Sequence, residues 1–365
     1  MEIRAAAKKG QIEPERLESW ERGEGRPTIA QLRRLGRIYK RPLAVFYLPR
    51  PPKGFDPLHD FRRLPGVRVR GQSPELVYEI RRAQERRDLA IELYGTTEGD
   101  LPPFGIEGST QDEPEELAAA IREFLGINYD EQVTWGSVER AFKRWRVALE
   151  SRLVLVFQAP RIKPTEMRGF SISATPMPVV VLNSKDSIGA RIFTMLHELC
   201  HVVIRNGGVC DLGNDRIEVF CNHVAGAALV PAEHLLREPL VGQARKKDGW
   251  TDADLRALAT RYGVSREVVL RRLLILGRTT EAFYRSRRDK WQAEFDALDK
   301  RSTGGPAQHI LAVSRAGPLF VRLVLANYRQ ENITASDVAD FLAVKLKHLP
   351  KIESEVLGPT GGVAA

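Results

Sequence analysis

Short runs of β-branched and aromatic residues are confined to one stretch of the chain. LVLVFQ (153–158) and PVVVLN (178–183) are continuous apolar runs, whereas RGFSISA (168–174) alternates between apolar and polar positions. Runs of this length and composition are typical of strands. The pattern therefore predicts a small sheet of short strands in the middle of the chain.

Helical spacing of apolar residues dominates on both sides of these strands. After the last strand it predicts a long helix from about Ile188 to Ile204, capped by Asp186 or Ser187, and a second helix from Arg216 to Leu229. Further helices are expected over residues 74–94, 113–125, 135–150, 253–262, 266–276, 318–328 and 335–345. The expected fold class is therefore helix-rich α+β.

Two more short helices are expected near the N-terminus. Pro14 stands where the first turn of a helix ending at Glu21 would begin, and the glycines that follow would end it. Thr28 can cap a second helix, whose apolar stripe includes Leu35. Two short helices joined by a tight turn are compatible with a helix-turn-helix.

Proline- and glycine-rich stretches suggest where the parts of the chain begin and end. The parts expected are a helix-turn-helix fragment (1–52), a basic connector with a helix (53–112), a core that contains the sheet (113–231), an all-helical region (232–350) and a flexible tail (351–365).

The composition excludes several classes of protein. Hydrophobic residues make up 43% of the 365 residues and charged residues 28%, an ordinary globular balance. No apolar run approaches the ~20 residues of a membrane helix, and the N-terminus lacks the apolar stretch of a signal peptide. Three cysteines form no disulfide framework. These features predict a cytoplasmic protein without a membrane contact.

The excess positive charge lies in the N-terminal part. The formal net charge is +9; residues 1–72 hold 17 basic and 8 acidic side chains, and the remaining residues balance. Such asymmetry suggests DNA as a partner of residues 1–72, although a solvated basic surface has the same composition.

The motif HELCH, from His197 to His201, is an H-E-x-x-H within the long helix expected after the strands. Residues four apart on a helix differ by about 40° in azimuth, so both imidazoles leave from one face. Two neutral nitrogens side by side suit Zn²⁺. Glu198 lies one residue further round the helix, where we expect it to act on a water molecule rather than to bind the metal.

A catalytic zinc usually has three protein ligands. One common pattern would need glycine at position 204 and histidine at 207, but the chain has Ile204 and Gly207. The other common ligand is a glutamate on the next helix, and Glu218 occupies its first turns. Asn222 shares the face of Glu218 and is expected to hydrogen-bond a ligand histidine. His223 would point about 140° away from Glu218, so we prefer Glu218.

Other metal-binding side chains carry weaker patterns. Cys200, Cys210 and Cys221 form no C-x-x-C pair, and buried free cysteines are common core residues. His223 and His234 are expected to be structural or surface residues. A site of two histidines and one glutamate also accepts Mn²⁺ or Fe²⁺, so the residues alone do not select zinc.

At these residues the chain resembles the ImmA/IrrE family of metallopeptidases. VVVLNSKDSIGARIFTMLHELCHVV is similar to that family's strand, loop and helix, and IEVFCNHVAGAALVP to its E-x-x-A-N-x-x-A helix, with Cys221 where alanine is usual. ALESRLVLVFQAP and MRGFSIS resemble the preceding strands, and DLRALATRYGVSREVVLRRLLILG the helical region that follows.

The resemblance implies a gluzincin-like metallo-endopeptidase. By likeness to thermolysin-like zincins, His197, His201 and Glu218 would bind Zn²⁺ and Glu198 would be the catalytic base. The family implies site-specific cleavage of a repressor-type protein, which relieves repression of stress, mobile-element or phage genes.

The N-terminal part resembles an XRE-type helix-turn-helix over EPERLESWERGEGRPTIAQLRRLGRIYKRPLAVFYLP. The segment before it is short, so the first helix of that domain would be missing and only a fragment of the second would remain. The presumed reading helix carries Glu13, Glu15, Glu18 and Glu21, which disfavours phosphate contacts. This part could instead dock a partner protein.

Two other functions compete with the peptidase. One is a DNA-binding transcriptional regulator whose metal site is sensory or vestigial, and the basic N-terminal part motivates it. The other is an antitoxin-like component of a control pair.

Overall fold

The computed structural model describes residues 3–39, 46, 72–204, 215–242, 246–298 and 306–357. By their internal contacts the described residues form two compact units, one up to Glu85 and one from Arg86 onwards. The predictions for the basic side chains of residues 53–71, for Cys210 and for residues 358–365 concern residues outside the described part.

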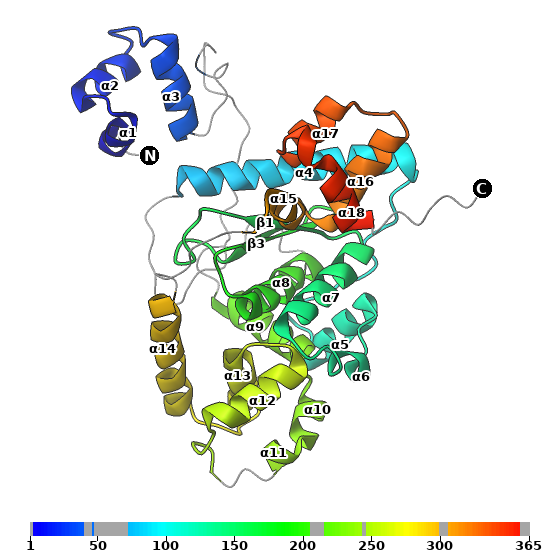
Figure 1. Cartoon of the computed structure of the whole chain (residues 1–365). Helices are drawn as coiled ribbons and strands as arrows, with labels where there is room; N and C mark the ends of the chain where they lie inside the picture. Colours follow the sequence, from blue (N-terminus) through cyan, green and yellow to red (C-terminus); the bar gives the residue numbers. More distant parts are fainter. Residues whose placement is uncertain are drawn as a thin grey trace. The chain divides into compact units, whose positions relative to one another are not determined.

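The first unit contains three short helices and the beginning of a long one (Figure 1). The bounds are α1 Ile3–Gly10, α2 Pro14–Glu21 and α3 Ile29–Tyr39, and α4 (Pro74–Thr97) begins here. Ala6, Ala7, Leu17 and Leu35 form their common core. The hydrophobic pattern predicts α2 and α3 but not α1, because alanines supply its buried face and an isolated helix this short is marginal in water.

The second unit is built around the expected small sheet. Its strands are β1 Leu155–Ala159, β2 Gly169–Ile172 and β3 Val179–Asn183. Their order is β1-β3-β2, with β3 parallel to β1 and antiparallel to β2. β3 is buried along its whole length, as its continuous apolar run requires. In the part of the chain that the structure describes, β2 is therefore an edge strand.

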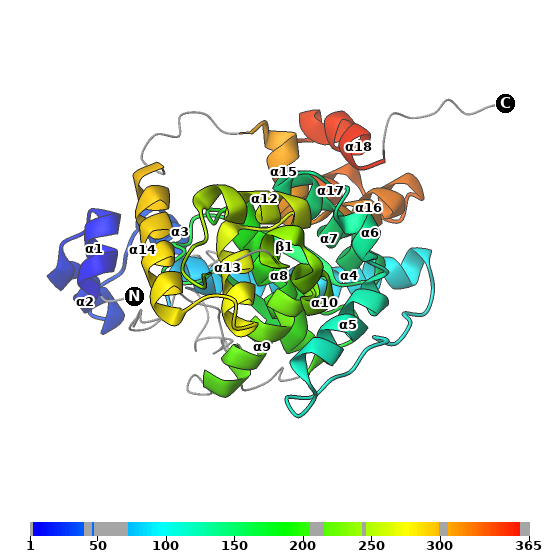
Figure 2. The ribbon, with the colours of Figure 1, turned by 90° about the horizontal axis from the view of Figure 1, so that it is seen from below.

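Helices cover both faces of this sheet (Figure 1). On one face lies α8 (Ile188–Val203), which contacts β2 and β3; on the other lies α15 (Gln308–Ala316), which contacts β1. Helix α9 (Asp215–Leu229) packs against α8 and against α5 (Pro114–Leu125), as Figure 2 shows from below. The sheet thus fixes α8, and α8 in turn fixes α9.

The remaining helices complete this unit. Their bounds are α6 Tyr129–Gln132, α7 Val138–Ser151, α10 Ala232–Arg237, α11 Pro239–Gly242, α12 Asp252–Tyr262, α13 Arg266–Ile275, α14 Glu281–Leu298, α16 Pro318–Arg329, α17 Ala335–Leu342, the 3₁₀ turn Leu346–His348 and α18 Leu349–Leu357. The expected helix-rich α+β fold is confirmed.

Two expected boundaries are wrong. Helix α17 ends at Leu342 rather than near residue 345, because Ala343 adopts a left-handed backbone with φ 54°. A flexible tail is expected from residue 351, yet α18 continues to Leu357 and buries Ile352. Only Leu349 and Ile352 of this nine-residue helix are buried, and two positions give little periodic signal, which is why the pattern misses it.

None of the helices in the described residues is, on its own, long and apolar enough to cross a bilayer. Helices α15 and α16 meet that test only when they are taken together, and a bend of 103° separates them.

Candidate metal centre

Helix α8 is held in place along its whole length. Its first turn is capped by Ser187, whose Oγ accepts a hydrogen bond from the backbone N–H of Ala190 (3.3 Å). Of the two expected caps, Ser187 is therefore the one used. The stripe of Ile192, Leu196, Leu199 and Val203 is buried, as its spacing predicts. The two histidines of the motif lie on the opposite face of the helix, away from this stripe.

Both histidines of the motif project from α8 toward α9. His197 and His201 are buried, and their Nε2 atoms lie 3.1 Å apart. Glu218, in the first turn of α9, places one carboxylate oxygen 3.3 Å from Nε2 of His197 and the other 3.1 Å from Nε2 of His201. Three potential ligands therefore converge from two helices.

The spacing of these atoms fits a single tetrahedral metal ion. Ligands at about 2.1 Å from a tetrahedral ion are about 3.4 Å apart, close to the separations here. The ligand atoms of His197, His201 and Glu218 all lie within 4.8 Å of one another. The side chain of Glu218 is 39% exposed, so the group can be reached from solvent.

The surroundings of Glu218 favour its ionised form. Burial alone would raise the pKa of this carboxyl. Its hydrogen bonds with His197 and His201 lower the pKa by more than burial raises it, so the pKa lies well below its usual range. A carboxylate that stays ionised is the form that a divalent cation binds.

Glu198 lies beside the triad and faces the sheet instead. Its side chain is buried, and its Oε2 accepts a hydrogen bond of 3.0 Å from the hydroxyl of Ser171 on β2. Gly169 permits this close approach, since a Cβ there would lie 3.1 Å from Oε1 of Glu198 and closer still to the Cγ2 of Thr194. The edge strand and the carboxyl of Glu198 are therefore neighbours.

Asn222 and His223, the two other residues of α9 considered from the sequence, lie in different surroundings. Asn222 is partly buried and, within the described part of the chain, makes no hydrogen bond with either histidine. His223 turns away from the triad, as its azimuth predicts, and its Nε2 lies 2.8 Å from Oε1 of Glu115 on α5.

Glu115 also receives a bidentate ion pair. Both terminal nitrogens of Arg272, on α13, lie 2.8 and 2.9 Å from its two oxygens, and the Arg272 Nε donates to the carbonyl oxygen of Val230. Burial raises the pKa of Glu115, but the hydrogen bonds with His223 and Arg272 outweigh it and lower the pKa to about 2. This cluster ties α9 to α5 and α13.

The two described cysteines lie near the triad without joining it. Cys200 and Cys221 are buried and free. Burial raises the pKa of the Cys221 thiol, and the adjacent Cys200 raises it further. A thiol that stays protonated is a poor metal ligand. Among the described residues, the converging group consists of His197, His201 and Glu218 and includes neither cysteine.

Sequence reasoning missed Ser171 and Gly169. The only signal was the alternation of RGFSISA, which makes every second residue share one face of the strand but does not say which element that face meets. Arg272 and Glu115 were missed because they lie 157 residues apart in the chain.

The fold and this centre together define a peptidase domain with a candidate metal-binding triad. Residues 152–274 match the family model described as Peptidase_M78, the IrrE N-terminal-like domain. The chain thus contains a domain of the ImmA/IrrE family, which confirms that resemblance. The match does not extend to the N-terminal part, whose helix-turn-helix resemblance stays a prediction. No curated protein and no solved structure matches the chain.

Proposed function

We propose that the protein is a zinc-dependent endopeptidase that cleaves a repressor-type protein and so relieves transcriptional repression. The observation that carries this proposal is the convergence of His197, His201 and Glu218, with Glu198 beside them, in a peptidase-family domain. The packing of α9 against α8 brings Glu218 to the three residues of α8.

His197, His201 and Glu218 are the proposed metal ligands. A zinc ion bound there would acidify a water molecule and polarise the scissile carbonyl. The donor set of two imidazoles and one carboxylate also suits Mn²⁺ or Fe²⁺, so zinc is the first choice among several divalent ions. Asn222, four residues after Glu218 and on the same face of α9, is proposed to support a ligand histidine by hydrogen bonding.

Glu198 is the proposed general base. It would take a proton from the attacking water and later deliver it to the leaving amine. The hydroxyl of Ser171 donates a hydrogen bond to Oε2 of Glu198 and so helps to orient the carboxyl for this transfer. Burial of Glu198 keeps bulk water away from that transfer.

The edge strand offers a way to hold an extended substrate. β2 pairs with β3 on one side, and within the described residues its other edge is not paired with a strand. A peptide that adds to this edge would run beside Gly169 and Ser171, and therefore past Glu198. Main-chain hydrogen bonds would supply affinity that depends little on sequence.

The substitution Glu198→Gln tests the chemistry. It preserves size and leaves the three proposed ligands in place, so zinc content should stay at the wild-type value. Cleavage should fall by about 10²–10⁴-fold, the contribution typical of general acid–base catalysis. Undiminished cleavage by Glu198→Gln would remove this residue from its role.

The repressor substrate needs a test of its own. The purified protein would be incubated with zinc and with a helix-turn-helix repressor encoded next to it, and the products analysed by mass spectrometry. A single cut that Glu198→Gln does not make supports the proposal. Cleavage of unrelated proteins at equal rates would leave a peptidase without this regulatory role.

The alternative function is that of a DNA-binding regulator with a sensory or vestigial metal site, or of an antitoxin-like component. The surplus of nine positive charges in residues 1–72 favours contact with a polyanion. Salt-sensitive DNA binding that survives His197→Ala, together with no proteolysis, would favour this alternative.

A further inference from the structure

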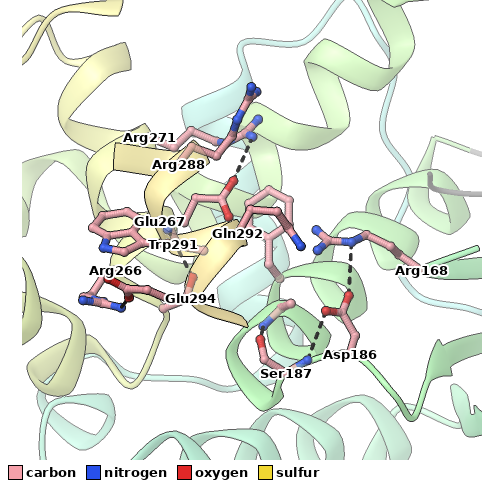
Figure 3. Close-up of a pocket in the computed structure, with 14 residues that line it drawn as sticks. Arg168, Asp186, Ser187, Arg266, Glu267, Arg271, Arg288, Trp291, Gln292 and Glu294 are labelled. Atoms are coloured by element: carbon pink, nitrogen blue, oxygen red, sulfur yellow. Dashed lines mark hydrogen bonds and ion pairs between the residues drawn. The ribbon is translucent and has the colours of Figure 1, made fainter. Parts of the chain in front are cut away.

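A separate pocket opens beside the N-terminal half of α8. Its volume is about 250 Å³, and it is lined from the residue before β2, from the first turns of α8 and α13, and from one face of α14 (Figure 3). All of these elements belong to the second compact unit. Neither the proposed ligands nor Glu198 lines this pocket.

One wall of the pocket is shared with the candidate metal centre. Phe193 lines the pocket, and its ring stacks on that of His197 with a centroid separation of 6.4 Å. Arg168, on another wall, directly precedes Gly169, which abuts Glu198. A peptide that runs along β2 past Glu198 would therefore reach this pocket within a residue or two.

The size of the pocket favours a single side chain. Sites for drug-sized ligands and cofactors have volumes of about 300–1,000 Å³, and this pocket lies below that range. Trp291, Phe193 and Val268 contribute apolar surface, against which the methylene groups of a side chain can pack.

The charges of the lining favour an acidic side chain. Four arginines and three carboxylates line the pocket, a formal surplus of one positive charge. Each carboxylate already has an arginine from the lining: Asp186 pairs with Arg168 (3.2 Å), Glu294 with Arg266 (3.3 Å) and Glu267 with Arg271 (3.6 Å). A basic side chain would have to compete with these arginines.

Arg288 supplies the surplus. Its ion pair is with Asp289, the adjacent residue, which does not line the pocket. Both side chains are exposed, at 39% and 69%, so this pair is weak and easily exchanged for another carboxylate. Arg168 lies across the pocket from Trp291 and Arg266, so positive groups face an incoming side chain from opposite walls (Figure 3).

We propose that this pocket is a specificity subsite that binds an acidic side chain of the polypeptide substrate, with Arg288 as its principal partner. The inference rests on the proposed peptidase function, because it takes the substrate to be a chain lying along β2. It adds a substrate class: polypeptides with an aspartate or glutamate close to the cleaved bond.

A peptide-binding measurement tests the proposed subsite independently of cleavage. The full-length Glu198→Gln protein would be titrated with fluorescein-labelled decapeptides of alanine and serine that carry a run of either glutamates or glutamines. We expect the glutamate peptide to bind about tenfold more tightly, the effect of one charge-assisted hydrogen bond. Arg288→Glu should remove this preference.

Arg285→Glu is the matched control. Arg285 lies on the same helix, is exposed and pairs with Glu281, but it does not line the pocket. Its substitution makes the same change of net charge and should leave the preference intact. Equal loss in both variants, or no preference in the parent protein, would overturn the inference.

Cleavage of a peptide library by the wild-type protein separates the two proposals. Enrichment of aspartate and glutamate at one position near the cut, lost in Arg288→Glu, supports both. Cleavage without such enrichment contradicts the subsite and leaves the peptidase standing. No cleavage, combined with Arg288-dependent binding of the glutamate peptide, contradicts the peptidase and keeps an acid-binding pocket.

Discussion

Ser171 on the edge strand donates a hydrogen bond of 3.0 Å to Oε2 of Glu198 on α8. The bond joins the strand proposed to hold the substrate to the residue proposed to move the proton. Because Glu198 is buried, bulk water competes little with this hydrogen bond. We therefore expect Ser171 to act as a positioning residue in the proposed reaction.

Ser171→Ala should slow cleavage and leave metal binding unchanged. A hydrogen bond to a charged group contributes about 1.5–3 kcal/mol, so the expected fall in kcat is roughly tenfold or more. The measurement is steady-state cleavage together with zinc analysis. Ser173→Ala, two residues further along the same stretch, is the control; a fall no larger than the control's would contradict the positioning role.

Gly169→Ala should disturb the same neighbourhood by steric conflict. The new Cβ would meet Thr194 and would lie 3.0 Å from the carbonyl oxygen of Val181. Overpacking of this kind costs about 1–3 kcal/mol, measurable as a lower free energy of unfolding in urea. Adding Thr194→Ser, which removes the nearest methyl group, should restore part of the loss.

The control for this prediction is Gly105→Ala, where the nearest atom to the new Cβ, on Phe124, is 3.8 Å away. It should change stability little. If Gly169→Ala were as stable and active as the control, the close contact between Gly169 of β2 and Thr194 of α8 would be contradicted.

Glu115 should make stability depend on pH in the acid range. Its pKa is lowered from 4.5 to about 2 in the folded protein. A group whose pKa falls on folding stabilises the protein above its unfolded pKa, and this contribution disappears as the pH falls from about 4.5 to 2. Urea unfolding should therefore show that the free energies of unfolding of the wild type and of Glu115→Gln become more similar as the pH falls across that range.

Near neutral pH the same substitution should be destabilising. Arg272 is fully buried and would lose its charge partner, but Glu115 is 41% exposed, so water replaces part of the interaction. We expect a loss of about 1–3 kcal/mol, below that of a fully buried pair. Glu116→Gln, one residue on and exposed, should have little effect; equal losses would contradict the cluster's role.

Much of this centre is predictable from local pattern. The i, i+4 spacing places His197 and His201 on one face, and the azimuth along α9 separates Glu218 from His223. Both deductions depend only on helical geometry within one element. The buried stripe of α8 and the continuous apolar run of β3 are likewise properties of single elements.

The unpredicted parts depend on how separate elements meet. Ser171 faces Glu198 because β2 lies antiparallel to β3 at the edge of the sheet, and no local pattern specifies that order. Arg272 meets Glu115 across three packed helices. Helix α1 was not predicted for the same reason. Its alanines are buried only because α2 and α3 pack against them, and no local pattern specifies that packing.

Titration of the metal-free protein with zinc by isothermal calorimetry tests the central claim most directly. We predict one zinc ion per chain for the wild type and for Glu233→Ala, an exposed glutamate of α10. Glu218→Ala should bind more than about a hundredfold more weakly, since losing even an outer partner of a ligand costs 10–100-fold. Equal affinity in Glu218→Ala, or no zinc binding by the wild type, would contradict the account.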